Sequence, residues 1–286
     1  MDYPPCVAPS SGKEDLRGMS HFCESSRGMP FTFAHPAAVL PLRRFRFLLT
    51  LPLVIGSLVP DVPYYFPHRI AQLWNDTHTL DGSFFICLPL GMALLVAVVL
   101  LRDPLTVLLS PRARAASLRS IEEFARRPMH WPIALLSLMI GTWTHIGWDS
   151  FTHPDGWTTM RVAALGSPIT VLGWDTTISH LLQYLSSVVG LLAVAEWIRR
   201  AIRRTPLPMG PEPVAPRVRQ LIVSMVAASS LLIVGMLAWR QEWYLDSYYH
   251  LSYLVLTRTI AWFGTLYLGA GLAVMFNRRA LPEPAA

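Results

Sequence analysis

The 286-residue chain is poor in charge, in cysteine and in lysine, and each shortage excludes a class of protein. Only 15% of the residues are charged, whereas a soluble globular domain carries about 25%. Cys6, Cys23 and Cys87 are too few and too scattered for a disulfide framework or a thiolate metal site. Lys13 is the only lysine among 24 basic residues, a composition that suggests a GC-rich bacterial genome. These shortages argue against a soluble domain and against a disulfide-rich secreted domain.

Hydrophobic sequence is what the chain has in excess, with 52% hydrophobic residues and a mean hydropathy of +0.39. Five continuous apolar stretches are each about 17–20 residues long, enough for a helix to cross about 30 Å of hydrocarbon. A sixth stretch, 47–59, is shorter and is interrupted by Pro52, which favours a re-entrant or interfacial segment. We therefore predict an all-α, polytopic membrane helical bundle of about five to six transmembrane segments, with one of them re-entrant. The five long stretches are 84–101, 131–147, 181–198, 221–239 and 259–276.

Basic residues alternate from loop to loop along the chain. Fourteen arginines lie in the loops 102–130 and 199–219 and after the last apolar stretch, against four in the alternate loops (Arg69, Arg161, Arg240 and Arg258). This pattern follows the positive-inside rule and predicts a cytoplasmic C-terminus. The net charge of +6 thus reflects topology and affinity for anionic lipid, and it gives no reason to expect nucleic-acid binding.

Composition also divides the chain into four parts. Residues 1–28 are polar and lack the apolar core of a signal peptide, so we predict a disordered extension, with Met29 as an alternative start. A membrane core over 29–204 follows, then a proline- and arginine-rich cytoplasmic linker over 205–218 and a two-span segment over 219–286. If 47–59 crosses the membrane, His35 lies inside. If 31–59 dips in and returns, His35 and Asp61 share the outer side; the short length favours this reading, and the arginine cluster at 43–46 favours the first.

Histidines and aspartates gather at the predicted outer ends of the apolar stretches. Ionisable residues at such positions are costly and indicate a site, and a mixture of His and Asp indicates a metal first. His145 and Asp149 give the strongest signal, because residues four apart share one face of a helix. The alternative is that Asp149 merely hydrogen-bonds His145 and stabilises the helix end. The residues with this distribution are Asp61, His78, His145, Asp149, His153, Asp175 and His180.

The other members of this group have structural alternatives as well. Asp61 stands on a rigid Pro-Asp-Val-Pro corner, where an aspartate often simply starts a turn. His78 directly precedes an apolar stretch, where a solvated histidine is common. His180 would share a helix face with Gln183 and Tyr184, either of which could orient its imidazole.

The order of these residues resembles a known family. Residues 31–38 (FTFAHPAA), residues 56–61 (GSLVPD) and the segment from His145 to Asp149 resemble the DUF4184 family of bacterial membrane proteins. The resemblance runs from Met29 to the C-terminus. More distantly, the order His, Asp, His, His-x-x-x-Asp, His, His is similar to zinc-dependent phospholipase C, to P1-type nucleases and to the LexA-regulated membrane-bound metal-dependent hydrolases.

The distant resemblance implies a set of metal ligands. Asp61, His78, His145 and Asp149 would be the core ligands, Asp149 would bridge two ions, and further metals would be served by His35, His153 and His180. The chain has Tyr184 where the soluble enzymes have a glutamate, and nothing in it suggests their processed N-terminal ligand. We therefore expect one or two ions of a divalent metal, zinc in the first place.

These observations favour a membrane-embedded metal-dependent hydrolase, a phosphoesterase, at the outer face of the bacterial cytoplasmic membrane. Zinc would activate a water molecule, with Asp61 or Asp149 as the catalytic carboxylate. The location suggests a phospholipid or a lipid-linked phosphate as substrate. Two alternatives stay open: a non-catalytic membrane protein with a structural His/Asp cluster, and a transporter, although transporters place ionisable residues nearer the midplane.

Overall fold

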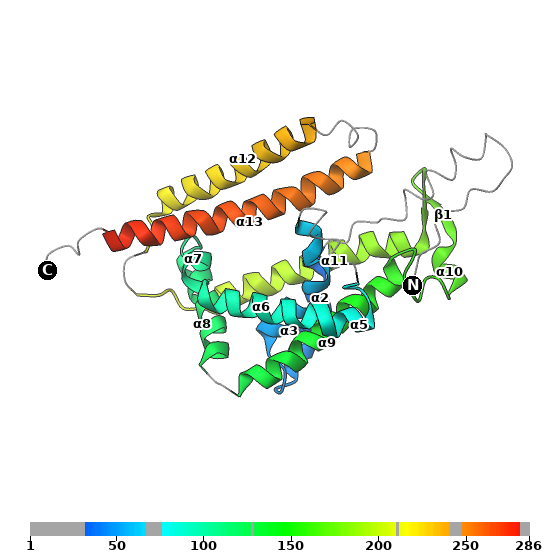
Figure 1. The fold of residues 1–286 in the computed structure, drawn as a ribbon, viewed down its shortest axis with the longest axis horizontal. Coiled ribbons are helices and arrows are strands. Elements are labelled where there is room, and N and C mark those ends of the chain that lie inside the picture. Colours follow the sequence, from blue (N-terminus) through cyan, green and yellow to red (C-terminus); the bar gives the residue numbers. More distant parts are fainter. Residues whose placement is uncertain (1–31, 67–75, 127–128, 210–211, 241–247, 281–286) are drawn as a thin grey trace.

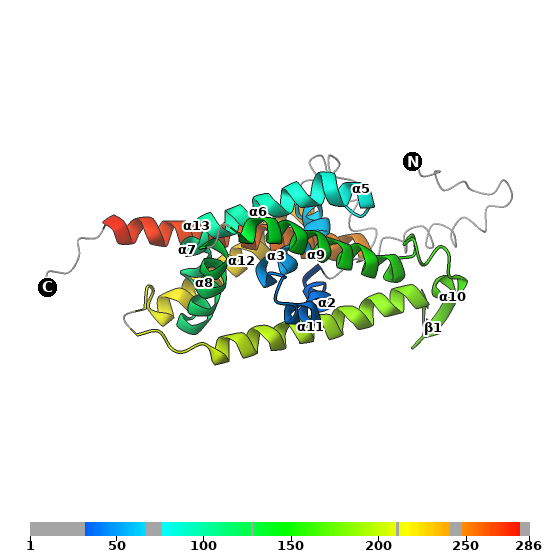
Figure 2. The same cartoon turned by 90° about the horizontal axis from the view of Figure 1, so that it is seen from below.

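The computed structural model describes residues 32–66, 76–126, 129–209, 212–240 and 248–280, and this part of the chain is almost entirely helical (Figure 1). The predicted extension 1–28 lies outside the described residues. Long helices run roughly along one direction in both views, with shorter ones packed between them (Figures 1 and 2). The all-α membrane bundle predicted from the sequence is confirmed.

Four helices are long and apolar enough to cross a membrane: Leu80–Leu100, Ile178–Arg204 (α11), Pro216–Arg240 (α12) and Val255–Asn277 within α13 (Tyr248–Ala280). The first consists of α5 (Leu80–Gly82), a π-helical turn, η5 (Ser83–Cys87), and α6 (Leu88–Leu100). These helices correspond to four of the five long apolar stretches. In Figure 1, α12 and α13 lie side by side as an antiparallel pair.

The fifth stretch forms α9 (His130–Thr152), which has 23 residues but is not among the four candidate spans. The described residues thus contain four candidate spans, against the five to six segments predicted from the sequence. Polar residues in the second half of the helix lower its hydropathy, and Thr142, His145 and Asp149 among them are buried. Because α9 packs against α3, α6 and α11, its polar side chains lie inside the bundle.

The segment before the first candidate span folds into short pieces: η1 (Thr32–Ala34), α2 (Pro36–Val39), η2 (Leu40–Arg44), α3 (Thr50–Gly56) and η3 (Val59–Tyr65). Prolines recur here, and each removes a backbone donor, which keeps the helices short. With seven residues, α3 is about 10 Å long and cannot cross a bilayer. This arrangement fits the re-entrant interpretation.

The helix α3 packs closely on α9 because glycines stand at the crossing. A Cβ on Gly56 would overlap the backbone of Leu138, and one on Gly141 would overlap the carbonyl oxygen of Leu53. Around this crossing lies the main hydrophobic core, with Ile55, Val59, Cys87, Leu95, Phe124, Ala134 and Leu138 buried. The packing holds η3, which follows α3, against the second half of α9.

At the other end of α6, two helices replace the predicted loop 102–130. They are α7 (Arg102–Thr106) and α8 (Pro111–Ala125), and α8 is amphipathic, with Ile121 and Phe124 buried. The helix α13 packs on α7, and Val107, Leu108 and Val214 form a small core there. The division into a core and a two-span segment stays a prediction.

A β-hairpin interrupts the predicted outer loop 150–179. Its strands are β1 (Pro168–Val171) and β2 (Trp174–Thr177), and a short helix, α10 (Ala163–Gly166), precedes them. Leu172 and Gly173 form the turn, and both have positive φ, as a two-residue type I′ hairpin requires. The Thr177 hydroxyl then caps α11 by accepting a hydrogen bond from the backbone N–H of His180. The run Ile-Thr-Val-Leu-Gly was the available signal for this hairpin.

Candidate metal centre

His145 and Asp149 lie one turn apart on α9 and face the same way, as their spacing predicted. Asp149 Oδ2 is 3.1 Å from His145 Nε2. Both residues are buried, and the side chain of His145 has no exposed surface. The pair alone would be compatible with a simple hydrogen bond, so the surrounding residues decide what it can do.

Asp61 and His78 complete a group of four with this pair. Asp61 is completely buried on η3, and its Oδ1 lies 3.4 Å from His145 Nε2 and 3.3 Å from His78 Nε2. His78 Nε2 is also 3.5 Å from Asp149 Oδ2. One ligand atom from each of the four residues lies within 4.8 Å of every other. The structure therefore brings together the four core residues predicted from the sequence.

The spacing of these four atoms fits a small cation. Four of the six separations are between 3.1 and 3.5 Å. In a regular tetrahedron, an edge of about 3.3 Å corresponds to a centre-to-corner distance of about 2.0 Å, the length of zinc–nitrogen and zinc–oxygen bonds. Two imidazoles and two carboxylates are also a donor set that zinc accepts.

The hydrogen bonding of His145 also supports a cation at this place. His145 Nδ1 lies 2.8 Å from the carbonyl oxygen of Ser57, to which it donates its hydrogen. The other nitrogen of a neutral His145 then presents an electron pair to two carboxylates. Within the described residues, Asp61 Oδ1, Asp61 Oδ2, His145 Nε2 and Asp149 Oδ2 are buried without a hydrogen-bond partner. Burying such atoms unpaired is costly, and a cation between them removes that cost.

The Asp61 carboxyl is ionised, as a metal ligand must be. Burial acts to raise the pKa of this carboxyl, but the imidazoles of His145 and His78 outweigh burial and hold the pKa well below its usual range. Asp61 is therefore a buried carboxylate anion. Protonated imidazoles of His145 and His78 supply the balancing charge in this state, and a divalent cation held by the four residues would replace those protons.

A second group of residues faces the other oxygen of Asp149. His35 Nε2 lies 3.5 Å from Asp149 Oδ1, and His153 Nε2 lies 3.7 Å from the same atom. The His35 ring stacks on His145 with 3.7 Å between ring centroids. Burial, together with His145, lowers the pKa of His35 to about 4, so this imidazole is neutral near pH 7 and can act as a ligand. His35 thus belongs to the same site as Asp61, as the re-entrant interpretation expected.

His153 directly follows the end of α9. It stands one turn beyond Asp149, so His145, Asp149 and His153 form a series spaced by four. The amide nitrogen of Gln183 lies 3.1 Å from His153 Nε2. Gln183 therefore contacts His153, whereas the sequence suggested it as a partner for His180.

His180 and Asp175 stand further from the four core residues. His180 is buried on α11, stacks on the ring of Tyr184 at 5.4 Å, and its Nε2 has no hydrogen-bond partner in the described part of the chain. Tyr184 thus packs against His180, as one of its two suggested partners. Asp175 is exposed on β2 and accepts a hydrogen bond from Thr170, so it does not join the site.

Sequence reasoning missed the groups that orient the core histidines. One is the Ser57 carbonyl, and another is the Thr77 hydroxyl, which lies 3.1 Å from His78 Nδ1. A backbone carbonyl has no side-chain signature, whereas Thr77 could have been suspected as the neighbour of His78. Such partners set the tautomer and direction of metal-binding histidines.

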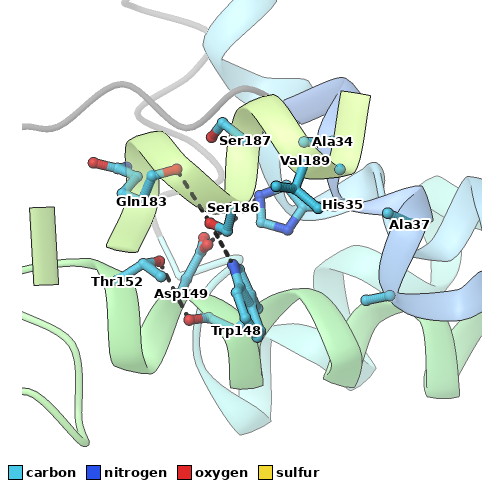
Figure 3. A pocket seen from close by; sticks show the side chains of 12 residues that line it. Ala34, His35, Ala37, Trp148, Asp149, Thr152, Gln183, Ser186, Ser187 and Val189 are labelled. Atoms are coloured by element: carbon cyan, nitrogen blue, oxygen red, sulfur yellow. Dashed lines mark hydrogen bonds and ion pairs between the residues drawn. The ribbon is translucent and has the colours of Figure 1, made fainter. Parts of the chain in front are cut away.

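A pocket of about 250 Å³ adjoins the cluster, and it too was not foreseen (Figure 3). It lies between α2, α9 and α11, and His35 and Asp149 form part of its wall. A group held at the cluster would therefore be accessible from this pocket.

Comparison with known proteins assigns the chain to a family. Residues 29–276 match the family model DUF4184, a domain of unknown function. The chain belongs to the DUF4184 family. No curated protein and no solved structure matches it. The DUF4184 description names no activity, so the function must be argued from the site, and the more distant resemblance to zinc hydrolases stays a prediction.

Proposed function

We propose that this DUF4184 protein is a membrane-embedded, metal-dependent hydrolase of phosphoesters. The observation that carries the proposal is the group Asp61, His78, His145 and Asp149, whose ligand atoms converge at the spacing of a divalent ion; atoms of Asp61, His145 and Asp149 among them are buried without a hydrogen-bond partner. In this proposal the four residues hold one zinc ion. Asp149 Oδ1, His35 and His153 offer three ligands for a second ion, which would leave a coordination position open for water, and His180 lies beside His153 as a further ligand for that ion only if the water is absent.

The chemistry follows from the donor set and from access to it. Zinc held by imidazole and carboxylate supplies hydroxide near neutral pH and offsets charge on a phosphoryl oxygen. Asp61 and Asp149 each have two carboxylate oxygens, and an oxygen that is not a ligand can accept the proton of the attacking water. The pocket along His35 and Asp149 gives a phosphate group a route to the site.

The location of the site suggests the substrate. Four candidate spans support integration in a membrane, and the arginine-rich loops support a cytoplasmic C-terminus under the positive-inside rule. The site then faces the outer side of the bacterial cytoplasmic membrane. A phosphoester at that interface is a phospholipid or a lipid-linked phosphate.

Hydrolysis by the reconstituted protein tests this proposal. In nanodiscs, the zinc-loaded chain is expected to cleave bis(p-nitrophenyl) phosphate or p-nitrophenyl phosphate, to lose this activity with EDTA and to regain it with zinc. Asp61→Asn keeps the shape of the side chain but removes its charge, and should lower the rate by about 100-fold or more. Asp175→Asn is the matched control, because Asp175 is an exposed aspartate outside the site.

The opposite result separates catalysis from structure. A protein that binds zinc but hydrolyses neither ester, at any zinc concentration, would contradict the proposed activity. The cluster would then be a closed structural site, since a catalytic zinc keeps a coordination position open for water.

A further inference from the structure

The pocket beside the cluster exists because small residues face each other across two elements. Ala34, Ala37 and Ala38 line it from the N-terminal segment, and Ser186, Ser187 and Gly190 line it from α11. Large side chains at these positions would fill the space between the helices. Instead, about 250 Å³ stays open between the cluster and the surface of α11. Figure 3 shows these residues around the space beside Asp149 and His35.

One side of the pocket is apolar and reaches the surface that would face lipid. Val189 is 65% exposed and Trp148 is 45% exposed, and both line the pocket. Since α11 is a candidate membrane span, its exposed apolar face lies against hydrocarbon. The Trp148 indole donates a hydrogen bond to the Ser186 hydroxyl, which ties α9 to α11 beside the opening (Figure 3). An apolar chain could thus pass between the bilayer and the pocket without crossing water.

The other side of the pocket is polar and lacks partners. His35 and Gln183 line it, each more than nine-tenths buried, and His35 Nδ1 and Gln183 Oε1 have no hydrogen-bond partner among the described residues. Asp149, which belongs to the cluster, completes this end. Unpaired buried polar atoms beside an open space indicate a ligand that supplies their partners.

We propose that this pocket binds the alkyl chain of an amphiphilic phosphate whose head group lies at Asp149 and His35. This inference rests on the proposed phosphoesterase function, and adds that the protein selects substrates by their chain. The chain lies among the alanines and Gly190, and the head group reaches the cluster. A phosphoester without an alkyl chain forgoes the apolar contacts and binds more weakly.

Phosphonates of two lengths test this, because they carry the same head group and are not hydrolysed. The binding of octylphosphonate and of ethylphosphonate to the zinc-loaded protein in nanodiscs is measured by calorimetry, with empty nanodiscs subtracted. Octylphosphonate should bind at least tenfold more tightly. Ala37→Phe, which fills the pocket, should abolish that advantage and leave the zinc content unchanged; Ser187→Leu provides a second filling variant. Ala193→Phe, on the exposed face of α11 outside the pocket, should change nothing.

The possible results distinguish the alkyl-chain site from the proposed phosphoesterase activity. Equal affinity for the two phosphonates, or an octyl advantage that survives both filling variants, would overturn the alkyl-chain site while leaving the phosphoesterase proposal intact. Failure of the zinc-loaded wild type to bind either phosphonate would overturn both.

Discussion

At the scale of single residues, His145 is the centre of the site. One ring nitrogen donates to the Ser57 carbonyl, and the other lies between the carboxylates of Asp61 and Asp149. The residue is completely buried, so water cannot relieve the two negative charges. Leaving an uncompensated charge in a protein interior costs about 3–5 kcal/mol. Protonated His145 and His78 or a bound divalent cation can provide the compensation, and the four distances suit zinc.

The Thr77 hydroxyl provides a prediction at this scale. It holds His78 Nδ1, and removing such a partner from a ligand histidine weakens metal binding by about 10- to 100-fold. Thr77→Val should therefore raise the zinc Kd by that factor, measured by competition with a fluorescent chelator. Thr106→Val makes the same change at a buried threonine in α7 and should leave the Kd unaltered. An equal effect of both variants would show that Thr77 acts on general stability and not on the site.

At the scale of elements, the crossing of α3 and α9 positions the ligands. Gly56 and Gly141 allow the two backbones to touch, and the Thr142 hydroxyl donates to the Gly56 carbonyl across the contact. The Ser57 carbonyl, which orients His145, follows directly after Gly56. A change in this crossing should therefore disturb zinc binding as well as stability.

Two glycines of α9 give a matched test of that idea. Gly141→Ala would force a Cβ into the Leu53 carbonyl, and we expect a destabilisation of about 1–3 kcal/mol together with weaker zinc binding. At Gly147 nothing lies within 4 Å of the new atom, so Gly147→Ala should be neutral, or stabilising by about 0.5–1 kcal/mol. Thermal unfolding with and without zinc measures both. Identical behaviour of the two variants would contradict a positioning role for the crossing.

Some contacts between these elements could be predicted from the sequence, and others could not. The spacing of His145 and Asp149 is local, so their shared helix face could be predicted. The positions of the apolar stretches grouped them with Asp61 and His78 but also with Asp175, which lies outside the site, and only the distant resemblance singled out the four core residues. The Ser57 carbonyl, the pocket and the contact of Gln183 with His153 depend on how distant elements pack, which a single sequence does not state. The fifth apolar stretch, 131–147, was predicted to span the membrane because most of its residues are apolar. Its few polar residues face the interior of the bundle, and a single sequence does not show this.

At the scale of the whole molecule, the arginines and the His/Asp cluster lie at opposite ends of the helical bundle. The arginines of α8 and the end of α11 gather at one end of the long helices, and the His/Asp cluster lies toward the other, near α5 and the end of α9 (Figure 1). The positive-inside rule predicts that the arginine end is cytoplasmic. The site should then be reached from the outer side.

Labelling of single cysteines tests this orientation. With Cys6, Cys23 and Cys87 replaced by serine, Asp175→Cys should react with a membrane-impermeant maleimide in intact cells, because the proposed orientation puts β2 at the outer end. Arg203→Cys, exposed at the end of α11, should react only after lysis. The reverse pattern would place the site in the cytoplasm and contradict the proposed substrate side.

Metal content tests the central claim most directly. The purified protein is dialysed and its zinc is counted per chain by mass spectrometry, for the wild type and for Asp61→Asn, His145→Ala and Asp175→Asn. We predict one or two zinc ions in the wild type and in Asp175→Asn, and a loss of zinc in the other two variants. If the wild type holds no metal even after zinc is supplied, or if all variants hold the same amount, the cluster is not a metal centre.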